Sequence, residues 1–359
     1  MRIGPRQIGN GAPPYIIAEI GVNHDGSAER ALELIDAAAD AAADAVKLQL
    51  FQADLLLSDS AELAGYQQAA GEQSPREMLR RLELPLEAMP ALVERAHARG
   101  LHAVVTPFSV PLVGPALAAG FDAIKIASPD LINLPLLRAV ERTGLPMIVS
   151  TGASYLNEVS RAAGWLREAA GRTAWLQCVS SYPARDEDAS ILAMEDLRTA
   201  VDGPVGYSDH TTGVDTGAVA AALGASVLEK HLTWSTQAPG PDHAASLEPD
   251  ELRAYAALAR EEGLMRDWMA GTMPTREDPR WGSGRKEVLP CEEDVRRLSR
   301  QSLVTTRALR PGDKLREEDI AIKRPGTGVE PWRLEEFLRK AVIRKVPANW
   351  LLSEDDVAW

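Results

Sequence analysis

The sequence predicts an α/β fold, a (β/α)8 barrel (TIM barrel) followed by a small C-terminal domain. Eight short apolar runs alternate with Ala- and Leu-rich segments that have helical periodicity. Each run is almost continuously apolar, which is typical of parallel strands that are buried on both faces. Eight such units over about 260 residues match this barrel in count and length.

Strands and helices are expected in alternation along the barrel. The strands are predicted at 15–20, 45–50, 102–106, 123–127, 146–150, 174–179, 205–207 and 226–232. The helices are predicted at 27–42, 86–99, 110–119, 134–143, 156–169, 194–201, 213–223 and 249–262. Ser27 can cap the first helix, and Gly100 and Gly120 can end two others. A doubly wound open sheet is the alternative, but the loop after the first strand, GVNHDGS, resembles its glycine-rich phosphate loop only weakly.

The domains are predicted to be unequal. Residues 1–272 are assigned to the barrel, 273–300 to a Pro-, Gly- and charge-rich linker, and 301–359 to the small domain. In the small domain, strands are predicted at 302–306 and 341–346 and a turn at 309–313. Helical segments are predicted there at 316–320 and 332–340.

The charge balance excludes some classes of function. The 359 residues include 39 Lys and Arg against 52 Asp and Glu, a net charge of −13. A protein this acidic is not expected to bind nucleic acid or an anionic membrane, because phosphate groups attract clustered cations. From residue 296 onward, however, 14 basic side chains outnumber 10 acidic ones. A basic C-terminal domain is therefore expected to dock on an acidic barrel.

The two cysteines, Cys178 and Cys291, are too few for a disulfide framework. Cys178 lies in the apolar run WLQCV and is predicted to be a small buried hydrophobic residue. No apolar stretch reaches 18 residues, and the N-terminus has no apolar signal core. A soluble cytoplasmic protein is expected.

Polar residues follow or interrupt every predicted strand at its carboxyl end, where barrels carry their functional groups. They are Glu19, Asn23 and His24; Lys47 and Gln49; Thr106 and Ser109; Lys125 and Ser128; Ser150 and Thr151; Ser180, Ser181 and Tyr182; Ser208, Asp209 and His210; and Glu229, Lys230 and His231. A lysine inside an apolar strand costs several kcal/mol unless its charge is matched. Lys47 and Lys125, with the hydroxyl groups around them, therefore predict a pocket for a small anion that carries phosphate and carboxylate groups.

Histidines and carboxylates form a second group. His210 and His231 end neighbouring strands and can bind a divalent metal, or one of them can act as a base or a hydrogen-bonding group in the core. His24 and His243 could reach the same rim, whereas His97 and His102 lie at the opposite end. Glu19, in an apolar context, is a candidate for proton transfer or a partner for Lys47. Asp242 lies on a loop, PGPDH, that suits a substrate clamp or a plain turn.

Over nearly its whole length the chain resembles the sialic acid (nonulosonic acid) synthases. The barrel motifs are AEIGVNHDG at 18–26, VKLQLF at 46–51, TPFS at 106–109, KIAS at 125–128, STGAS at 150–154, SSYPA at 180–184, GYSDHT at 206–211, EKHLT at 229–233 and PGPDHAASLEP at 239–249. The tail motifs, SLV at 302–304, RPGD at 310–313 and KRPGTGVEP at 323–331, resemble the antifreeze-like (SAF) domain.

The resemblance implies a condensation of phosphoenolpyruvate with an open-chain N-acetylated hexose, giving a nine-carbon 2-keto acid and phosphate. It implies phosphoenolpyruvate contacts from Lys47, Thr106, Lys125, Ser128, Ser150, Ser180 and Ser208. It implies proton transfer by Glu19 and a divalent metal on His210 and His231, Mn²⁺ first and Mg²⁺ or Co²⁺ as alternatives. It implies sugar contacts from Gln49, Asp130, Tyr182, Asp242 and Arg324, with Arg324 reaching the partner subunit of a domain-swapped homodimer.

Two departures from the family pattern concern the sugar. The chain has Pro129-Asp130 where many members have Gly-Glu, and Ser180 where some have Asn. N-acetylmannosamine, its 6-phosphate and the 2,4-diacetamido-trideoxyhexose precursors of legionaminic or pseudaminic acid therefore stay open. A free sugar is favoured because no further cationic cluster is present for a 6-phosphate. A lyase or aldolase with Lys125 as a Schiff base is a different enzyme that the residues allow, and a non-catalytic sugar- or ice-binding protein is a third interpretation.

Overall fold

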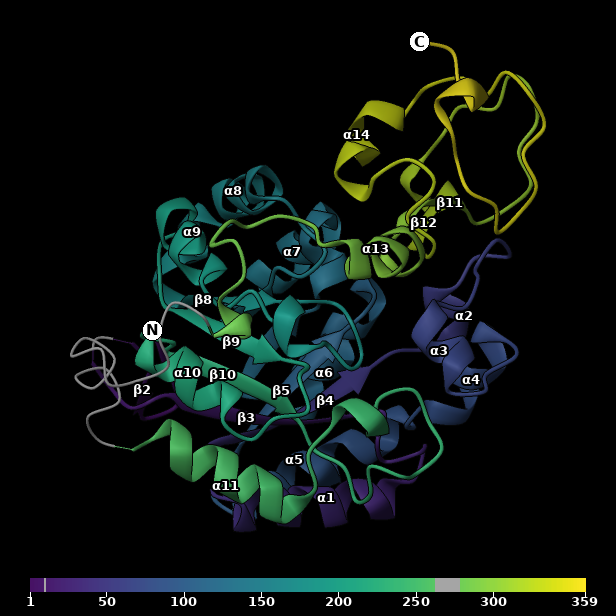
Figure 1. Ribbon diagram of the computed structural model, residues 1–359. Helices are drawn as coiled ribbons and strands as arrows, with labels where there is room; N and C mark the ends of the chain where they lie inside the picture. Colours follow the sequence, from purple (N-terminus) through teal and green to yellow (C-terminus); the bar gives the residue numbers. More distant parts are fainter. Residues whose placement is uncertain (10, 262–277) are drawn as a thin grey trace.

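The described part of the chain contains a closed barrel of eight parallel strands (Figure 1). The computed structural model describes residues 1–9, 11–261 and 278–359. In sequence order the strands are β3 (Tyr15–Gly21), β4 (Ala45–Leu50), β5 (His102–Pro107), β6 (Ala123–Ile126), β7 (Met147–Ser150), β8 (Thr173–Cys178), β9 (Val205–Asp209) and β10 (Val227–His231). β10 pairs with both β9 and β3, which closes the barrel and confirms the predicted fold class.

Helices surround the strands as expected, with shorter bounds than predicted. They are α1 (Ala28–Asp40), α5 (Met89–Ala98), α6 (Val113–Ala119), α7 (Leu134–Glu141), α8 (Leu156–Trp165), α9 (Ala193–Ala200), α10 (Thr216–Ala222) and α11 (Pro249–Ala259). Ser27 caps α1 by accepting a hydrogen bond from the backbone N–H of Arg30. The predicted end of the last helix, residue 262, lies outside the described residues. The apolar faces of strands and helices form one large buried cluster around the barrel.

The amino end of the barrel is closed by a short hairpin, β1 (Arg2–Ile3) and β2 (Arg6–Gln7). Ile3 and Ile8 are buried against the side chains that fill this end of the barrel interior. Two of the histidines lie at this end. The Nδ1 atom of His102 lies 2.8 Å from the hydroxyl of Tyr15, and the Nε2 atom of His97 lies 2.8 Å from Asp122. A site for polar ligands therefore has to lie at the carboxyl end.

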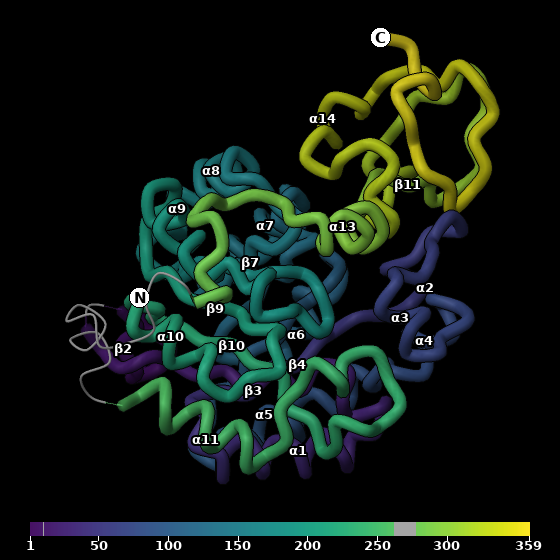
Figure 2. Tube along the Cα trace, in the orientation of Figure 1, coloured from purple at the N-terminus to yellow at the C-terminus, as the bar shows by residue number. Residues whose placement is uncertain are grey.

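The connection from β4 to α5 contains three short helices that were not predicted. They are α2 (Ala53–Leu56), α3 (Gly65–Ala69) and α4 (Pro75–Leu82), which stand beside the barrel below the C-terminal domain (Figure 2). Apolar side chains of α2 and α4 pack with Phe51 and Phe108 in a separate cluster. This cluster forms one wall of the carboxyl end.

The predicted linker is structured in its described part, whereas residues 273–277 lie outside the described residues. It contains the 3-10 turns η7 (Pro279–Trp281) and η8 (Pro290–Glu292) and the helix α13 (Glu293–Ser299). The buried carboxylate of Glu292 accepts hydrogen bonds from the backbone N–H groups of Ala153 (2.6 Å) and Ser180 (2.8 Å). Arg300, next to α13, pairs with Glu158 at 2.7 Å. The segment thereby holds the loops that follow β7 and β8. The predicted boundary at residue 272 also falls outside the described residues.

The C-terminal domain has an antiparallel pair, β11 (Ser302–Thr305) and β12 (Ile320–Lys323), a short helix α14 (Leu334–Phe337) and its own apolar core. Its 3-10 turns are η9 (Glu317–Asp319), η10 (Pro331–Arg333) and η11 (Glu354–Asp356). The predicted strand at 341–346 is wrong. Ala341, Val342 and Val346 each form an isolated bridge to a different segment, so no continuous ladder develops.

The C-terminal domain docks on the barrel wall beside α2. The hydroxyl of Ser58 donates to the backbone carbonyl of Arg324 at 2.7 Å, and Lys323 donates to the carbonyl of Asp54. Arg297 of α13 lies 3.5 Å from Glu62. These contacts fit the expectation that a basic C-terminal segment meets acidic groups of the barrel. Among the residues described, no helix has the length and apolar character needed to cross a membrane.

Candidate active site

A cavity lies at the carboxyl end of the barrel, between the strand ends, the wall formed by α2–α4, and α13. Its empty volume is about 910 Å³, open solvent at its mouth included. Most of the residues predicted for the site line it: Lys47, Gln49, Thr106, Lys125, Ser128, Ser150, Ser180, Tyr182, Ser208, His210, His231, Asp242 and Arg324. The remaining two, Glu19 and Asp130, are fully buried behind its wall.

Two lysines and Glu229 line the floor of the cavity, and the fully buried Glu19 contacts one of these lysines. The Nζ atom of Lys47 lies 3.0 Å from Glu19 and 3.2 Å from Glu229. The Nζ atom of Lys125 lies 3.4 Å from the same oxygen of Glu229 and 2.6 Å from the hydroxyl of Ser150. The strand register explains this convergence. Glu19 on β3 is paired with Lys47 on β4, and β10, which carries Glu229, is the neighbour of β3 on its other side. Each lysine in its apolar strand thus has the matching charge that its burial requires.

The same neighbours set the protonation of the two carboxyl groups. Burial raises the pKa of Glu19 to about 7, against the opposing effect of Lys47. Burial also acts to raise the pKa of Glu229, but Lys125 and Lys47 outweigh it and lower that pKa to about 2. Near neutral pH, Glu229 is therefore ionised, whereas the raised pKa of Glu19 lets this carboxyl group hold or release a proton, as a proton-transfer group would.

Hydroxyl groups surround the two lysines. The hydroxyl of Ser208 donates to Glu229 at 3.0 Å, and Ser128 accepts from the backbone N–H of Gly152 at 2.9 Å. Within the described chain, the buried hydroxyls of Thr106 and Ser180 have no hydrogen-bond partner. A side chain at Gly152 would come within 2.3 Å of the Ser180 hydroxyl, so glycine is required for this close packing. Unused donors beside two ammonium groups fit a ligand rich in oxygen atoms.

His210 and His231 lie together at the rim, with ring centroids 5.3 Å apart. The Nδ1–H group of His210 donates to the carbonyl of Val179 at 2.7 Å, which leaves Nε2 free to bind a metal. Burial and the nearby His210 lower the pKa of His231 well below its usual range, so its ring is neutral as a metal ligand must be. Asp242 lies 3.6 Å from His231. Among the described residues, no group of three or more metal-binding side chains converges. The two histidine rings are thus the side chains at the rim that could share a cation, although the effect of burial on the pKa of His210 is outweighed by the nearby Cys178, which raises that pKa.

Aromatic and apolar groups form the upper part of the cavity. The ring of Tyr182 lies 4.2 Å from that of His210 and 5.1 Å from that of Tyr66, between centroids. Arg324 lies over the ring of Phe108 at 5.6 Å. This Arg324 belongs to the same chain as the barrel, whereas the resemblance implied that it reaches the partner's barrel. Gln49, also predicted for the sugar, donates to Glu19 at 2.9 Å.

Asp130 does not reach the cavity. One of its carboxylate oxygens accepts hydrogen bonds from Asn133 at 3.0 Å and from Gln301 at 2.8 Å. The other oxygen is buried without a hydrogen-bond partner among the described residues. Burial raises the pKa of this carboxyl group to about 7. Asp130 is thus buried away from the cavity surface, and its predicted sugar contact stays a prediction.

Neither of the other two rim histidines lines the cavity. His24 is buried and accepts from the backbone N–H of Gly26, and burial lowers its pKa to about 4. His243 is buried between Thr233 and Asp25. Cys178, predicted to be a plain core residue, is buried but lines the cavity with its sulfur 3.7 Å from His210.

Two functional candidates were missed from the sequence. Glu229 was noted at the end of its strand without a role, although a charged residue in an apolar strand is the same signal that pointed to the lysines. Tyr66 lies on α3 and lines the cavity, but its segment has no periodicity that predicts a helix or its position.

A closed parallel barrel whose carboxyl end holds buried lysines, carboxylates and paired histidines defines a TIM-barrel enzyme. Residues 34–265 match the NeuB family, and residues 300–358 match the SAF domain. The chain belongs to the NeuB family. Several of its relatives are named synthases, and the chain is accordingly an enzyme of this synthase type.

Three relatives show the extent of the similarity. The N,N'-diacetyllegionaminic acid synthase of Legionella pneumophila is 36% identical over 357 residues, which cover 98% of this chain and 96% of the relative. The crystal structure of the spore coat polysaccharide biosynthesis protein SpsE of Bacillus subtilis matches with a TM-score of 0.86 and 31% identity, covering 100% and 99% of the two chains. The N-acetylneuraminic acid (sialic acid) synthetase of Leptospira borgpetersenii, in complex with citrate, matches with a TM-score of 0.66 and 31% identity, covering 77% and 92%.

Proposed function

We propose that the protein condenses phosphoenolpyruvate with an open-chain N-acetylated hexose to give a nine-carbon 2-keto sugar acid and phosphate. The observation that carries this proposal is the floor of the cavity. Lys47 and Lys125 line the same cavity as the two histidines and as Thr106 and Ser180, whose buried hydroxyls have no hydrogen-bond partner among the described residues. The arrangement suits one ligand with phosphate and carboxylate groups at the floor and a second, uncharged ligand above it.

The bond changes follow from the two substrates. C3 of phosphoenolpyruvate attacks the aldehyde carbon of the sugar, and the aldehyde oxygen takes up a proton. Water then adds to the cationic C2 and loses a proton, and the C2–O bond to phosphate breaks to leave the 2-keto acid. Lys47, Lys125 and the hydroxyls of Thr106, Ser128, Ser150, Ser180 and Ser208 hold phosphoenolpyruvate. Glu19, with a pKa of about 7, is the group proposed for proton transfer in this reaction.

His210 and His231 are the residues proposed to hold a divalent cation, Mn²⁺ first and Mg²⁺ or Co²⁺ as alternatives. The free Nε2 atom of His210, fixed through Val179, and the unpartnered Nδ1 atom of His231 support this assignment within the described part of the chain. The cation would supply Lewis-acid polarisation of the aldehyde. Tyr182, Asp242, Gln49 and Arg324 would orient the sugar.

Two sugar classes fit the upper cavity. N-acetylmannosamine is the first. A 2,4-diacetamido-trideoxyhexose, the type of sugar that leads to legionaminic or pseudaminic acid, is the second. Support for the second is the wall of Phe51, Leu56 and Phe108 beside the cavity, which suits additional methyl groups. The legionaminic acid synthase of L. pneumophila, at 36% identity, adds to that support. Arg324 is the single Lys or Arg side chain among the described lining residues of the upper cavity, which favours an unphosphorylated sugar.

The proposal extends to a domain-swapped homodimer in the cytoplasm. Domain swapping exchanges identical elements between protomers, so the contacts of Ser58 and Arg324 seen within one chain can form equally between two chains.

Phosphate release tests the reaction. Purified protein is incubated with phosphoenolpyruvate, Mn²⁺ and each candidate sugar, and phosphate and the 2-keto acid are measured together by colorimetry and mass spectrometry. We expect both products in a 1:1 ratio with at least one N-acetylated hexose. Lys125→Met should abolish the reaction, and the matched variant of an exposed lysine, Lys345→Met, should retain it. Failure to release phosphate with every such sugar would refute the proposal.

A further inference from the structure

We propose that Asp25 and His243 form a clasp between the first and last loops at the carboxyl end of the barrel, which positions Asp242 against His231. The inference rests on the proposed function, because Asp242 is a proposed sugar contact. Asp25 and His243 do not line the cavity, so they are positioning residues and act through Asp242.

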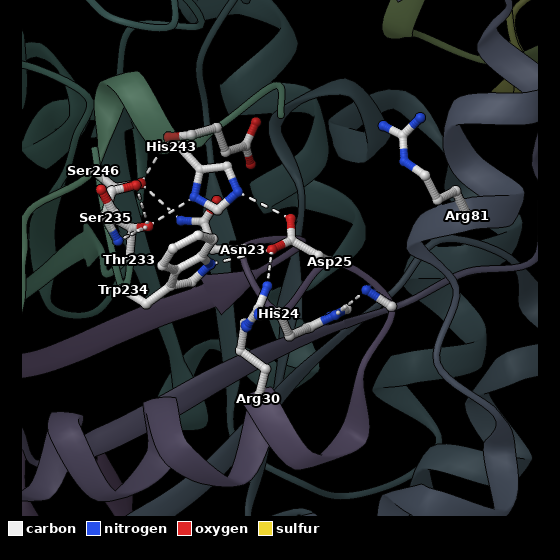
Figure 3. A network of polar contacts seen from close by, with 12 residues as sticks. Asn23, His24, Asp25, Arg30, Arg81, Thr233, Trp234, Ser235, His243 and Ser246 are labelled. Atoms are coloured by element: carbon white, nitrogen blue, oxygen red, sulfur yellow. Dashed lines mark hydrogen bonds and ion pairs between the residues drawn. The ribbon is translucent and has the colours of Figure 1, made fainter. Parts of the chain in front are cut away.

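The imidazole of His243 is held at both nitrogens. Its Nδ1 atom lies 2.7 Å from the hydroxyl of Thr233, and its Nε2–H group donates to Asp25 at 3.0 Å (Figure 3). The ring is buried, with 1% of the residue exposed. A side chain at Gly240 would come within 2.7 Å of this ring, so the PGPDH loop can pass over it only with glycine at that position. The ring therefore has one orientation in this packing.

Asp25 is itself fixed from three sides. Its second carboxylate oxygen accepts from Arg30 at 2.6 Å and from the indole N–H of Trp234 at 3.1 Å (Figure 3). Arg30 also stacks on the Trp234 ring at 4.5 Å. Asp25 has a φ of +52°, a left-handed conformation that a non-glycine residue adopts at a cost. This placement makes its carboxylate a rigid anchor for His243.

The clasp fixes the backbone that carries Asp242. The Ser246 hydroxyl donates to the carbonyl of Asp242 at 2.7 Å and accepts from Asn23 at 2.8 Å. Asn23 lies two residues before Asp25. His243, through Asp25, and Ser246, through Asn23, therefore both tie the segment that begins at Asp242 to the same loop after β3. The loop after β10 has little regular structure of its own, only the turn η6 (His243–Ala245). Loss of the clasp should therefore leave Asp242 poorly oriented while the barrel stays folded.

Two substitutions at His243 test this inference. His243→Ala removes both ring contacts, whereas His243→Gln places an amide donor near the Nε2 position and keeps the contact with Asp25. We expect the KM for the sugar to rise about tenfold or more in His243→Ala, with the KM for phosphoenolpyruvate unchanged. We expect His243→Gln to recover part of this loss. A matched control is His97→Ala, which breaks a His–Asp contact at the opposite end of the barrel.

Hydrogen exchange gives a readout that does not depend on turnover. In His243→Ala, exchange of the amides of Ala245 and Ser246, which bond to Asp242 and His243, should become faster, whereas exchange in the strands should not change. Unchanged exchange in this loop, or an equal rise of both KM values, would overturn the inference. The inference would also be overturned if the control His97→Ala raised the KM for the sugar, or speeded exchange in this loop, as much as His243→Ala does. Absence of phosphate release from the wild-type protein would instead refute the proposed function, and the exchange data would still decide whether the clasp holds the loop.

Discussion

The ammonium group of Lys47 lies between two carboxylates, 3.0 Å from Glu19 and 3.2 Å from Glu229. With Lys125 beside Glu229, the floor of the cavity has two cationic groups and two acidic groups. An anionic ligand therefore has to compete with Glu229 for the same two lysines.

Glu229→Gln keeps the shape of the side chain and removes its charge. We expect inorganic phosphate to bind about tenfold more tightly, because Lys47 and Lys125 lose a competing carboxylate. We also expect the free energy of unfolding to fall by about 3–5 kcal/mol, because buried ammonium groups lose a partner. Calorimetric titration with phosphate and urea denaturation measure the two effects. Weaker phosphate binding would show that Glu229 orients the lysines and does not compete for them.

Asp130→Asn should change the pH dependence of stability. The pKa of Asp130 is raised from 3.8 to about 7, so the folded protein holds this proton more tightly than the unfolded chain does. As pH rises from about 4 to about 7, wild-type protein should lose about 2–4 kcal/mol of unfolding free energy relative to Asp130→Asn. The variant keeps the oxygen that accepts from Asn133 and Gln301. Urea denaturation at pH 4.5 and 7.5 tests this, and parallel pH profiles would contradict it.

The histidine pair should bind Mn²⁺ in the absence of substrate. We expect His231→Ala to lower Mn²⁺ affinity at least about a hundredfold, because one of two protein ligands is lost. His97→Ala, at the amino end, should bind Mn²⁺ as the wild-type protein does. Mn²⁺ electron paramagnetic resonance reports the bound fraction directly. Equal affinity in wild type and His231→Ala would remove the proposed metal role.

Mixing two inactive variants distinguishes capping within a chain from capping between chains. Arg324→Ala has an intact barrel and a defective cap, whereas His231→Ala has a defective barrel and an intact cap. In a domain-swapped dimer, one site of each mixed dimer has both intact parts, so refolding the two chains together should restore up to about half the activity per mixed dimer. A mixture that stays inactive would mean that each barrel is capped by its own chain.

Much of the barrel could be predicted because its signals are local. Apolar runs followed by polar residues located the strand ends, and Lys47, Lys125, His210 and His231 all line the cavity at those ends. Parallel pairing of the strands then brings such residues together, and this does not depend on the conformation of the connecting loops.

The residues that sequence reasoning missed depend on contacts between distant segments. Tyr66, on α3, lines the cavity and lies against the ring of Tyr182, which is 116 positions further along the chain. Gln301 holds Asp130 across 171 positions of the chain, and Glu292 holds the backbone of Ala153 across 139 positions. No periodicity or local motif marks such partners, because their positions are set by tertiary packing.

The closed amino end of the barrel has a kinetic consequence. Among the described residues, Ile3 and Ile8 are buried in the cluster that fills that end, so we expect ligands to reach the floor from the carboxyl end, where Arg324 lines the cavity. A ligand bound on Lys47 and Lys125 lies beneath any second ligand that contacts Tyr182 and Asp242. If the proposed function holds, we expect the two substrates to enter in a fixed sequence, the phosphorylated one first, and the product that remains on the lysines to leave last.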